Sequence, residues 1–204
     1  MMAQSLLLPG AEAPRAGSYG TRAVAVVYMA LGAVLVGTYV WGLLTLNAEF
    51  PASGGAQTLW GRIADPGNEW LMGIYYTSIG SAAIGFLPSL AYAFCIAPKL
   101  SRDLVNKICG SLAVFFVTEC FWLPMCVAYL ESPSAAVYTL IRLQLAVSGI
   151  CGLSWFYFKV LAVPDEVAAT VSAPLRLSAK AGTTIFVLHC AILDAIVWPP
   201  FFHK

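Results

Sequence analysis

Four strongly ionisable side chains lie inside the long apolar stretches of this 204-residue chain: Glu119, Arg142, His189 and Asp194. A charge at the centre of a bilayer costs about 2.5–3.5 kcal/mol on insertion scales, so such a group needs a partner, water or a neutral protonation state. Carboxyl, imidazole and guanidinium groups in that setting can join helices, bind a polar ligand or pass protons along. These four residues are therefore the candidate functional residues of the chain.

Depth in the membrane predicts how the four residues pair. At a rise of about 1.5 Å per residue, Glu119 and His189 lie about 16 and 12 Å from the inner ends of their predicted spans. Arg142 and Asp194 lie about 8 and 10 Å from the outer ends of theirs. We therefore expect two cross-helix pairs, Arg142 with Asp194 and Glu119 with His189. We expect these pairs to hold the bundle together rather than to catalyse a reaction.

Two other interpretations of the polar residues stay open. In the first, Glu119 and Asp194 face a ligand pocket beside Trp122 and Trp155. In the second, the titratable groups form a proton path. His189 and Asp194 are five residues apart, and at about 100° per residue they point about 140° apart on an α-helix, which disfavours one continuous path.

The elements that position these residues are five apolar stretches, and about 20 apolar residues in a helix cross the hydrocarbon core of a bilayer. The sequence predicts an all-α, polytopic integral membrane protein, a bundle of five transmembrane helices with short loops. We expect an inner-side tail at 1–22, the bundle at 23–201 and an outer-side end at 202–204. The predicted spans cover about 23–46, 70–97, 108–130, 137–158 and 181–201.

Proline and loop residues refine this outline. Pro88 and Pro124 predict kinks in the second and third spans, because a proline inside a helix removes a hydrogen bond. The last helix should end near Trp198, before Pro199-Pro200, because the residue before a proline avoids the helical conformation. In the outer loop, residues 57–63 favour a short interfacial helix.

Composition excludes several classes of protein. Hydrophobic residues make up 60% and charged residues 10% of the chain, whereas soluble domains are about 25% charged. The net charge of +1 is unlike the basic balance of a nucleic-acid-binding protein, so no nucleic acid partner is expected. The six cysteines form no C-x-x-C motif and no zinc-type spacing with histidine. We therefore expect no metal ion and no cofactor, and a bound phospholipid would be compatible with the chain.

The Lys and Arg residues in the loops predict an orientation. With five spans, eight lie on the side of the N-terminal tail and two on the other: Arg15, Arg22, Lys99, Arg102, Lys107, Lys159, Arg176 and Lys180 against Arg62 and Lys204. Cytoplasmic loops carry such an excess of basic residues. The N-terminus is therefore expected in the cytoplasm or matrix, and the C-terminus on the opposite side.

The second predicted span and the loop before it carry Asp65-Pro66, Trp70, Phe86-Leu87-Pro88 and Ala91-Tyr92-Ala93-Phe94. This stretch resembles the corresponding region of the sigma-2/emopamil-binding superfamily. The resemblance implies a small helical-bundle membrane protein that binds sterols and amphipathic amines or isomerises sterols. The helical carboxylate of that family would fall near Ile79, which cannot ionise.

These observations leave two hypotheses about function. The tail at 1–22 is rich in Ala, Gly and Pro and cannot build a core, so we expect other membrane protein subunits to hold it. The leading hypothesis is therefore a non-catalytic accessory subunit of a large multi-subunit membrane complex. Its preferred host is the respiratory chain or ATP synthase of the mitochondrial inner membrane. The rival is a binding protein or isomerase for a sterol-like molecule or amphipathic amine, with a pocket among the third, fourth and fifth spans.

Overall fold

The computed structural model describes residues 17–202, and all their regular structure is helical. Five helical spans within these residues are long and apolar enough to cross a membrane, which makes the chain compatible with an integral membrane protein. They cover Gly17–Glu49, Glu69–Lys99, Arg102–Glu131, Ala135–Leu161 and Ala173–Phe202. All five predicted spans are therefore present as helices, and each is several residues longer than the apolar stretch that predicted it.

The predicted tail and end segment lie largely outside the described residues. Residues 1–16 and 203–204 are not described, while residues 17–22 already belong to the first helix. The expectation that other subunits hold the tail 1–22 therefore falls outside the described part of the chain.

The first span consists of three consecutive helical segments. They are α1 (Gly17–Ala25), the π-helical segment η1 (Val26–Leu31) and α2 (Gly32–Glu49). The loop that follows forms two 3₁₀ segments, η2 (Pro51–Ser53) and η3 (Gly55–Ala64). The short helix predicted at 57–63 is thus part of η3.

The two spans for which a kink was predicted, the second at Pro88 and the third at Pro124, behave differently. The second span is the continuous helix α3 (Glu69–Ile96), which runs unbroken through Pro88 and ends in the 3₁₀ turn η4 (Ala97–Lys99). The third span is interrupted between α4 (Arg102–Glu119) and α5 (Trp122–Glu131). The interruption lies just before Pro124, whose ring has no N–H to donate to the preceding turn.

The last two spans both contain π-helical segments. The fourth consists of α6 (Ala135–Phe156) and η5 (Tyr157–Leu161). After the short α7 (Asp165–Ala168), the fifth span consists of α8 (Ala173–Leu188), η6 (His189–Val197) and α9 (Trp198–Phe202).

The expected helix end near Trp198 is wrong, because the helix continues through both prolines to Phe202. Neighbouring side chains hold this end. Tyr138 donates a hydrogen bond to the carbonyl oxygen of Pro199 over 2.8 Å, and the indole N–H of Trp198 donates one to the carbonyl oxygen of Leu59 over 2.8 Å.

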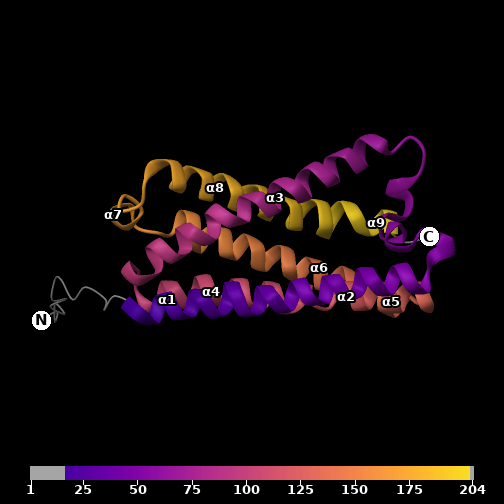
Figure 1. The fold of residues 1–204 in the computed structure, drawn as a ribbon, viewed down its shortest axis with the longest axis horizontal. Helices are drawn as coiled ribbons and strands as arrows, with labels where there is room; N and C mark the ends of the chain where they lie inside the picture. Colours follow the sequence, from indigo (N-terminus) through magenta and orange to yellow (C-terminus); the bar gives the residue numbers. More distant parts are fainter. Residues whose placement is uncertain (1–16, 203–204) are drawn as a thin grey trace, which may run out of the picture.

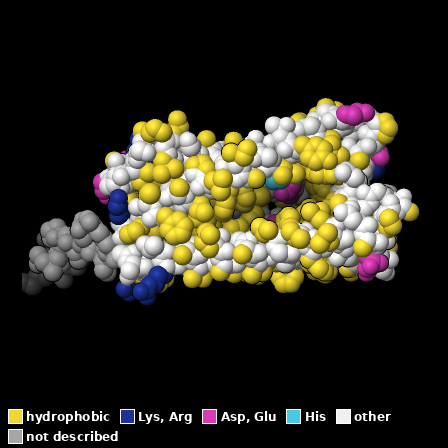
Figure 2. Space-filling view, viewed as in Figure 1, with side chains coloured by type: hydrophobic (Ala, Val, Ile, Leu, Met, Phe, Trp, Pro, Cys, Tyr) yellow, Lys and Arg dark blue, Asp and Glu magenta, His cyan; other side chains and the backbone are white. Residues whose placement is uncertain are grey.

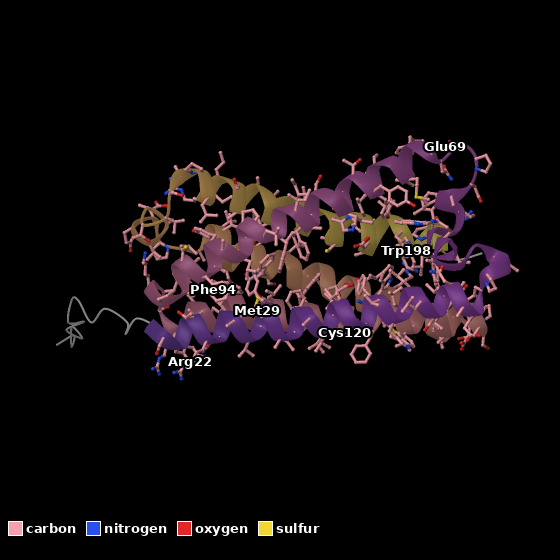
Figure 3. All side chains as sticks on the ribbon, in the orientation of Figure 1. Arg22, Met29, Glu69, Phe94, Cys120 and Trp198 are labelled. Atoms are coloured by element: carbon pink, nitrogen blue, oxygen red, sulfur yellow. The ribbon has the colours of Figure 1, made fainter. Side chains whose placement is uncertain are left out.

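The bundle has two distinct ends, which we name by the elements that lie there (Figure 1). The α7 end holds α7, the start of α1 and the η4 turn, and the η3 end holds η3 and α9. Arg22 lies at the α7 end, and Glu69 and Trp198 lie at the η3 end (Figure 3). The five spans therefore run back and forth along the long axis of the bundle.

Buried apolar residues form two separate cores along this axis. The core toward the α7 end surrounds Trp155, and the core toward the η3 end surrounds Trp198. Trp155 and Trp198 are 0% and 2% exposed. Helices α3 and α8 cross at Gly85 and Gly182, where a Cβ atom on Gly85 would lie 2.6 Å from the Cα of Gly182. The polar side chains of the candidate site lie between the two cores.

Candidate functional site

Glu119 is the last residue of α4 and stands directly before the interruption of the third span. Its side chain is 7% exposed. Tyr39 on α2 donates a hydrogen bond to its Oε2 atom over 2.9 Å, and Gln144 on α6 donates one to Oε1 over 3.2 Å. The carboxyl group therefore joins three spans at one point. Figure 3 places Cys120, the next residue, about halfway along the bundle.

The hydrogen bonds around Gln144 continue away from the carboxyl group. Its Nε2 atom also donates to the hydroxyl of Ser148 over 3.1 Å, and that hydroxyl lies 2.9 Å from Thr118 Oγ1. The Oε1 atom of Gln144 and the Nε1 atom of Trp122 are buried without a hydrogen-bond partner among the described residues. An unpaired buried polar atom costs about 1–3 kcal/mol. The site therefore has one acceptor and one donor that a ligand or water could satisfy.

A second group of polar residues joins the second and fifth spans. The Nδ1 atom of His189 lies 3.0 Å from Ser78 Oγ, and its Nε2 atom lies 3.3 Å from Asp194 Oδ2. The ring of Tyr75 meets the imidazole edge-on, with centroids 6.1 Å apart. Its hydroxyl donates to the carbonyl oxygen of Leu193 over 2.6 Å, so Tyr75 fixes both the ring and the turn that carries Asp194.

The structure thus arranges the predicted residues differently from the expected pairs. It brings His189 to Asp194 and surrounds Glu119 with Tyr39 and Gln144. The reason is the π-helical hydrogen bonding of η6, in which residue i bonds to residue i+5. Residues five apart then lie on one face, whereas on an α-helix they would point about 140° apart.

Arg142 does not take part in this cluster. It is exposed, and its guanidinium carbon lies 5.9 Å from the centroid of the Tyr138 ring. Within residues 17–202 it forms no ion pair. The predicted Arg142–Asp194 pair is therefore absent, because Asp194 turns toward His189 and Arg142 lies on the outside of α6.

The two tryptophans of the predicted pocket lie in different cores. Trp122 packs on Tyr39, with ring centroids 5.6 Å apart, and so borders the Glu119 group. Trp155 belongs to the core at the α7 end, where its indole N–H donates to the Tyr28 hydroxyl over 3.1 Å. Of the two predicted tryptophans, Trp122 therefore lies beside the Glu119 group and Trp155 lies apart from it; whether these residues bind a ligand stays a prediction.

The central polar cluster, by which we mean Tyr39, Glu119, Gln144, His189 and Asp194, is reached from one side of the bundle. Figure 2 shows a hollow between α3 and α2 that is bordered by hydrophobic atoms and has histidine and acidic atoms inside it. His189 is the only histidine within residues 17–202. The side chains of His189 and Asp194 are 12% and 28% exposed.

A buried lysine that the sequence interpretation placed in a loop forms a separate polar group. Lys159 lies in η5 and is 0% exposed. Its amine donates hydrogen bonds to Ser89 and Thr183, and it lies 4.2 Å from the centroid of the Trp155 ring. It has no carboxylate partner among the described residues. The loop assignment of Lys159 was wrong because the fourth span runs three residues beyond its predicted end, to Leu161.

Within residues 17–202, no group of three or more His, Cys, Asp or Glu side chains is placed to hold a metal ion. Comparison of the chain with protein-family models, with curated proteins and with solved structures finds no significant match. The class that the fold defines is an all-helical protein with five helices able to cross a membrane.

Proposed function

We propose that this chain is an integral membrane protein that binds an amphipathic amine at the central polar cluster. The observation that carries the proposal is the pair of carboxyl groups, Glu119 and Asp194, at one hollow without a Lys or Arg ion pair among the described residues. Burying a carboxylate requires a compensating charge or hydrogen bonds. A protonated amine from the lipid side would supply both.

The surroundings of the two carboxyl groups suit a cation with an apolar body. Tyr39, Tyr75 and Trp122 place aromatic rings around the cluster, and aromatic faces attract ammonium groups. The unpaired Oε1 atom of Gln144 can accept a hydrogen bond from an ammonium N–H. Apolar atoms line the rim of the hollow and would contact the hydrocarbon part of the ligand.

The resemblance to the sigma-2/emopamil-binding superfamily implies the same class of ligand, with its carboxylate on the second span. Here that position, Ile79, is 41% exposed on the outside of α3. The carboxyl groups come instead from the third and fifth spans. The proposal therefore rests on Glu119 and Asp194 and not on a transferred family site.

The proposal is tested by measuring binding of a lipophilic tertiary amine to the protein in nanodiscs, with the neutral alcohol of the same carbon skeleton as a second probe. Replacing Glu119 by Gln should weaken amine binding about tenfold or more, because a charge-assisted hydrogen bond contributes about 1.5–3 kcal/mol. Asp194→Asn should also weaken binding of the amine. In both variants the affinity for the neutral alcohol should change much less than the affinity for the amine.

The matched control is Glu131→Gln, which removes an exposed carboxylate at the end of α5. It should leave amine binding unchanged. If both Glu119→Gln and Asp194→Asn bound the amine as tightly as the wild type, the site would not be a cation site.

We also propose, as a second function, a non-catalytic accessory subunit of a multi-subunit complex, for which the mitochondrial inner membrane is the favoured location. The first span supports it, because this span is the least buried of the five. Val26, Met29, Val36 and Leu44 on it are each more than half exposed. A partner helix or bound phospholipid would cover this face, and the basic α7 end would face the matrix or cytoplasm.

Gentle solubilisation, native electrophoresis and mass spectrometry of the co-migrating band test the second function. Defined partner subunits in stoichiometric amount support it. A particle that contains this chain alone contradicts it, and that outcome leaves amine binding as the function.

A further inference from the structure

We propose that Ser78, His189 and Asp194 form the active site of an acyl hydrolase for lipid esters. His189 stands between the other two side chains: its Nδ1 atom is hydrogen-bonded to Ser78 Oγ over 3.0 Å, and its Nε2 atom lies 3.3 Å from Asp194 Oδ2. A nucleophile, a base within hydrogen-bond distance and a group that orients the base are the parts that nucleophilic catalysis requires. The activity goes beyond amine binding, because it depends on Ser78, which the binding proposal does not use.

The two partners of His189 select the tautomer that catalysis needs. When Asp194 is ionised it can only accept a hydrogen bond, and it then favours the tautomer of His189 with the proton on Nε2. The Nδ1 atom is then unprotonated and can accept the proton of the Ser78 hydroxyl. The edge-on ring of Tyr75 limits rotation of the imidazole, and the π-helical segment η6 keeps His189 and Asp194 on one face.

Ser78 is also placed where a substrate can reach it. It lines an open groove of about 580 Å³ on the outer surface of α3 and α8. The walls of the groove are mainly apolar, with Trp70 and Ile74 from α3 and Ile185 from α8. Such a wall suits the acyl chain of a lipid that enters from the bilayer. Thr77 and Ser81 line the same groove, and we assign their hydroxyl groups as the hydrogen-bond donors to the oxyanion.

The reaction balances with water as the only co-reactant. Ser78 Oγ attacks the ester carbonyl carbon while its proton passes to His189 Nδ1. The bond between the carbonyl carbon and the alcohol oxygen breaks, and His189 gives the proton to the leaving alcohol. Water then attacks the acyl-serine and loses a proton to His189, which returns it to Ser78 Oγ as the carboxylic acid leaves.

The test uses the full-length protein in nanodiscs and a fluorophosphonate probe with a long alkyl chain. We expect one phosphonylated peptide, and tandem mass spectrometry should place the adduct on Ser78. Turnover is measured with p-nitrophenyl decanoate. Ser78→Ala should reduce labelling and hydrolysis to background, whereas Ser111→Ala should leave both unchanged. The Ser111 hydroxyl bonds to carbonyl oxygens of its own helix, α4.

Asp194→Asn tests the positioning role separately. The amide can present an N–H group to Nε2 and so select the wrong tautomer. We expect kcat to fall at least about 100-fold while KM changes less than about threefold. Because a loss of folded protein would also lower the apparent kcat without changing KM, kcat is expressed per folded protein, with the folded fraction measured by circular dichroism.

The outcomes also separate the two proposals. Ser78→Ala should remove labelling and hydrolysis, while amine binding, which does not use Ser78, should persist. Absence of an adduct on Ser78 in the folded wild type, or an adduct on another serine, overturns the hydrolase assignment even where Ser78→Ala fails to fold.

Discussion

The crossing of α3 and α8 at Gly85 and Gly182 predicts a large effect from a single methyl group. A Cβ atom on Gly85 would lie 2.6 Å from the Cα of Gly182, whereas carbon atoms in contact lie about 3.5–4.0 Å apart. The two helices must therefore separate by about 1 Å to accept Gly85→Ala. Because overpacking of this kind costs about 1–3 kcal/mol, we expect a clear loss of stability.

The matched control lies on the same helix. Gly80 is exposed, and a Cβ atom there would meet nothing within 4 Å. Gly80→Ala should keep or raise stability, since alanine favours a helix over glycine by about 0.5–1 kcal/mol. Both variants share this gain, so they should differ by the overpacking cost alone, about 1–3 kcal/mol in free energy of unfolding. The assay is reversible unfolding with sodium dodecyl sulfate in dodecyl maltoside micelles, followed by circular dichroism. Equal midpoints for the two variants would refute the close crossing.

Three further predictions concern single side chains. Lys159→Met should leave the thermal unfolding midpoint unchanged or raise it, because the desolvation cost of the amine disappears while Ser89 and Thr183 still bond to each other over 2.9 Å; a drop of several degrees would contradict this. Ser101→Ala should cost about 1 kcal/mol in the same micelle titration, since Ser101 caps the amide of Leu104 at the start of α4; an unchanged midpoint would show that the cap contributes nothing. Arg142→Gln should alter neither stability nor amine binding, because its guanidinium group lies outside the central polar cluster. A loss of stability or of amine binding would instead support the predicted Arg142–Asp194 pair.

The spans could be predicted from sequence because hydropathy and length are properties of the local chain. Each apolar stretch was long enough for a bilayer, and the structure forms a helix at all five. The ends of the helices were less predictable, because they depend on contacts with residues far away in the sequence. The last helix passes Pro199-Pro200 because Tyr138 and the η3 loop hold it, and no pattern within the span itself contains that information.

The sequence shows which ionisable residues lie inside the spans, but their contacts could not be predicted from it. Glu119, His189 and Asp194 do lie together, as the cost of isolated charges in a membrane requires. Which residues can pair depends on the direction in which each side chain points around its helix axis. The geometry of an ideal α-helix gives the wrong directions for the π-helical segment η6. Ser78 and Lys159 were missed for different reasons. A serine in an apolar span is common, and a lysine near a span end ordinarily reaches the membrane surface.

The polar clusters coincide with the places where the spans depart from α-helical geometry. His189 and Asp194 lie in η6, and Lys159 lies in η5. Tyr28, which accepts a hydrogen bond from Trp155, lies in η1. Glu119 ends α4 at the interruption of the third span. A π-helical turn or an interruption rotates the side chains that follow it, and such turns are frequent at functional sites. In an apolar bundle this rotation is what turns isolated polar residues toward one another. The departures from α-helical geometry that made the predicted pairing wrong therefore mark where the buried polar residues of this protein gather.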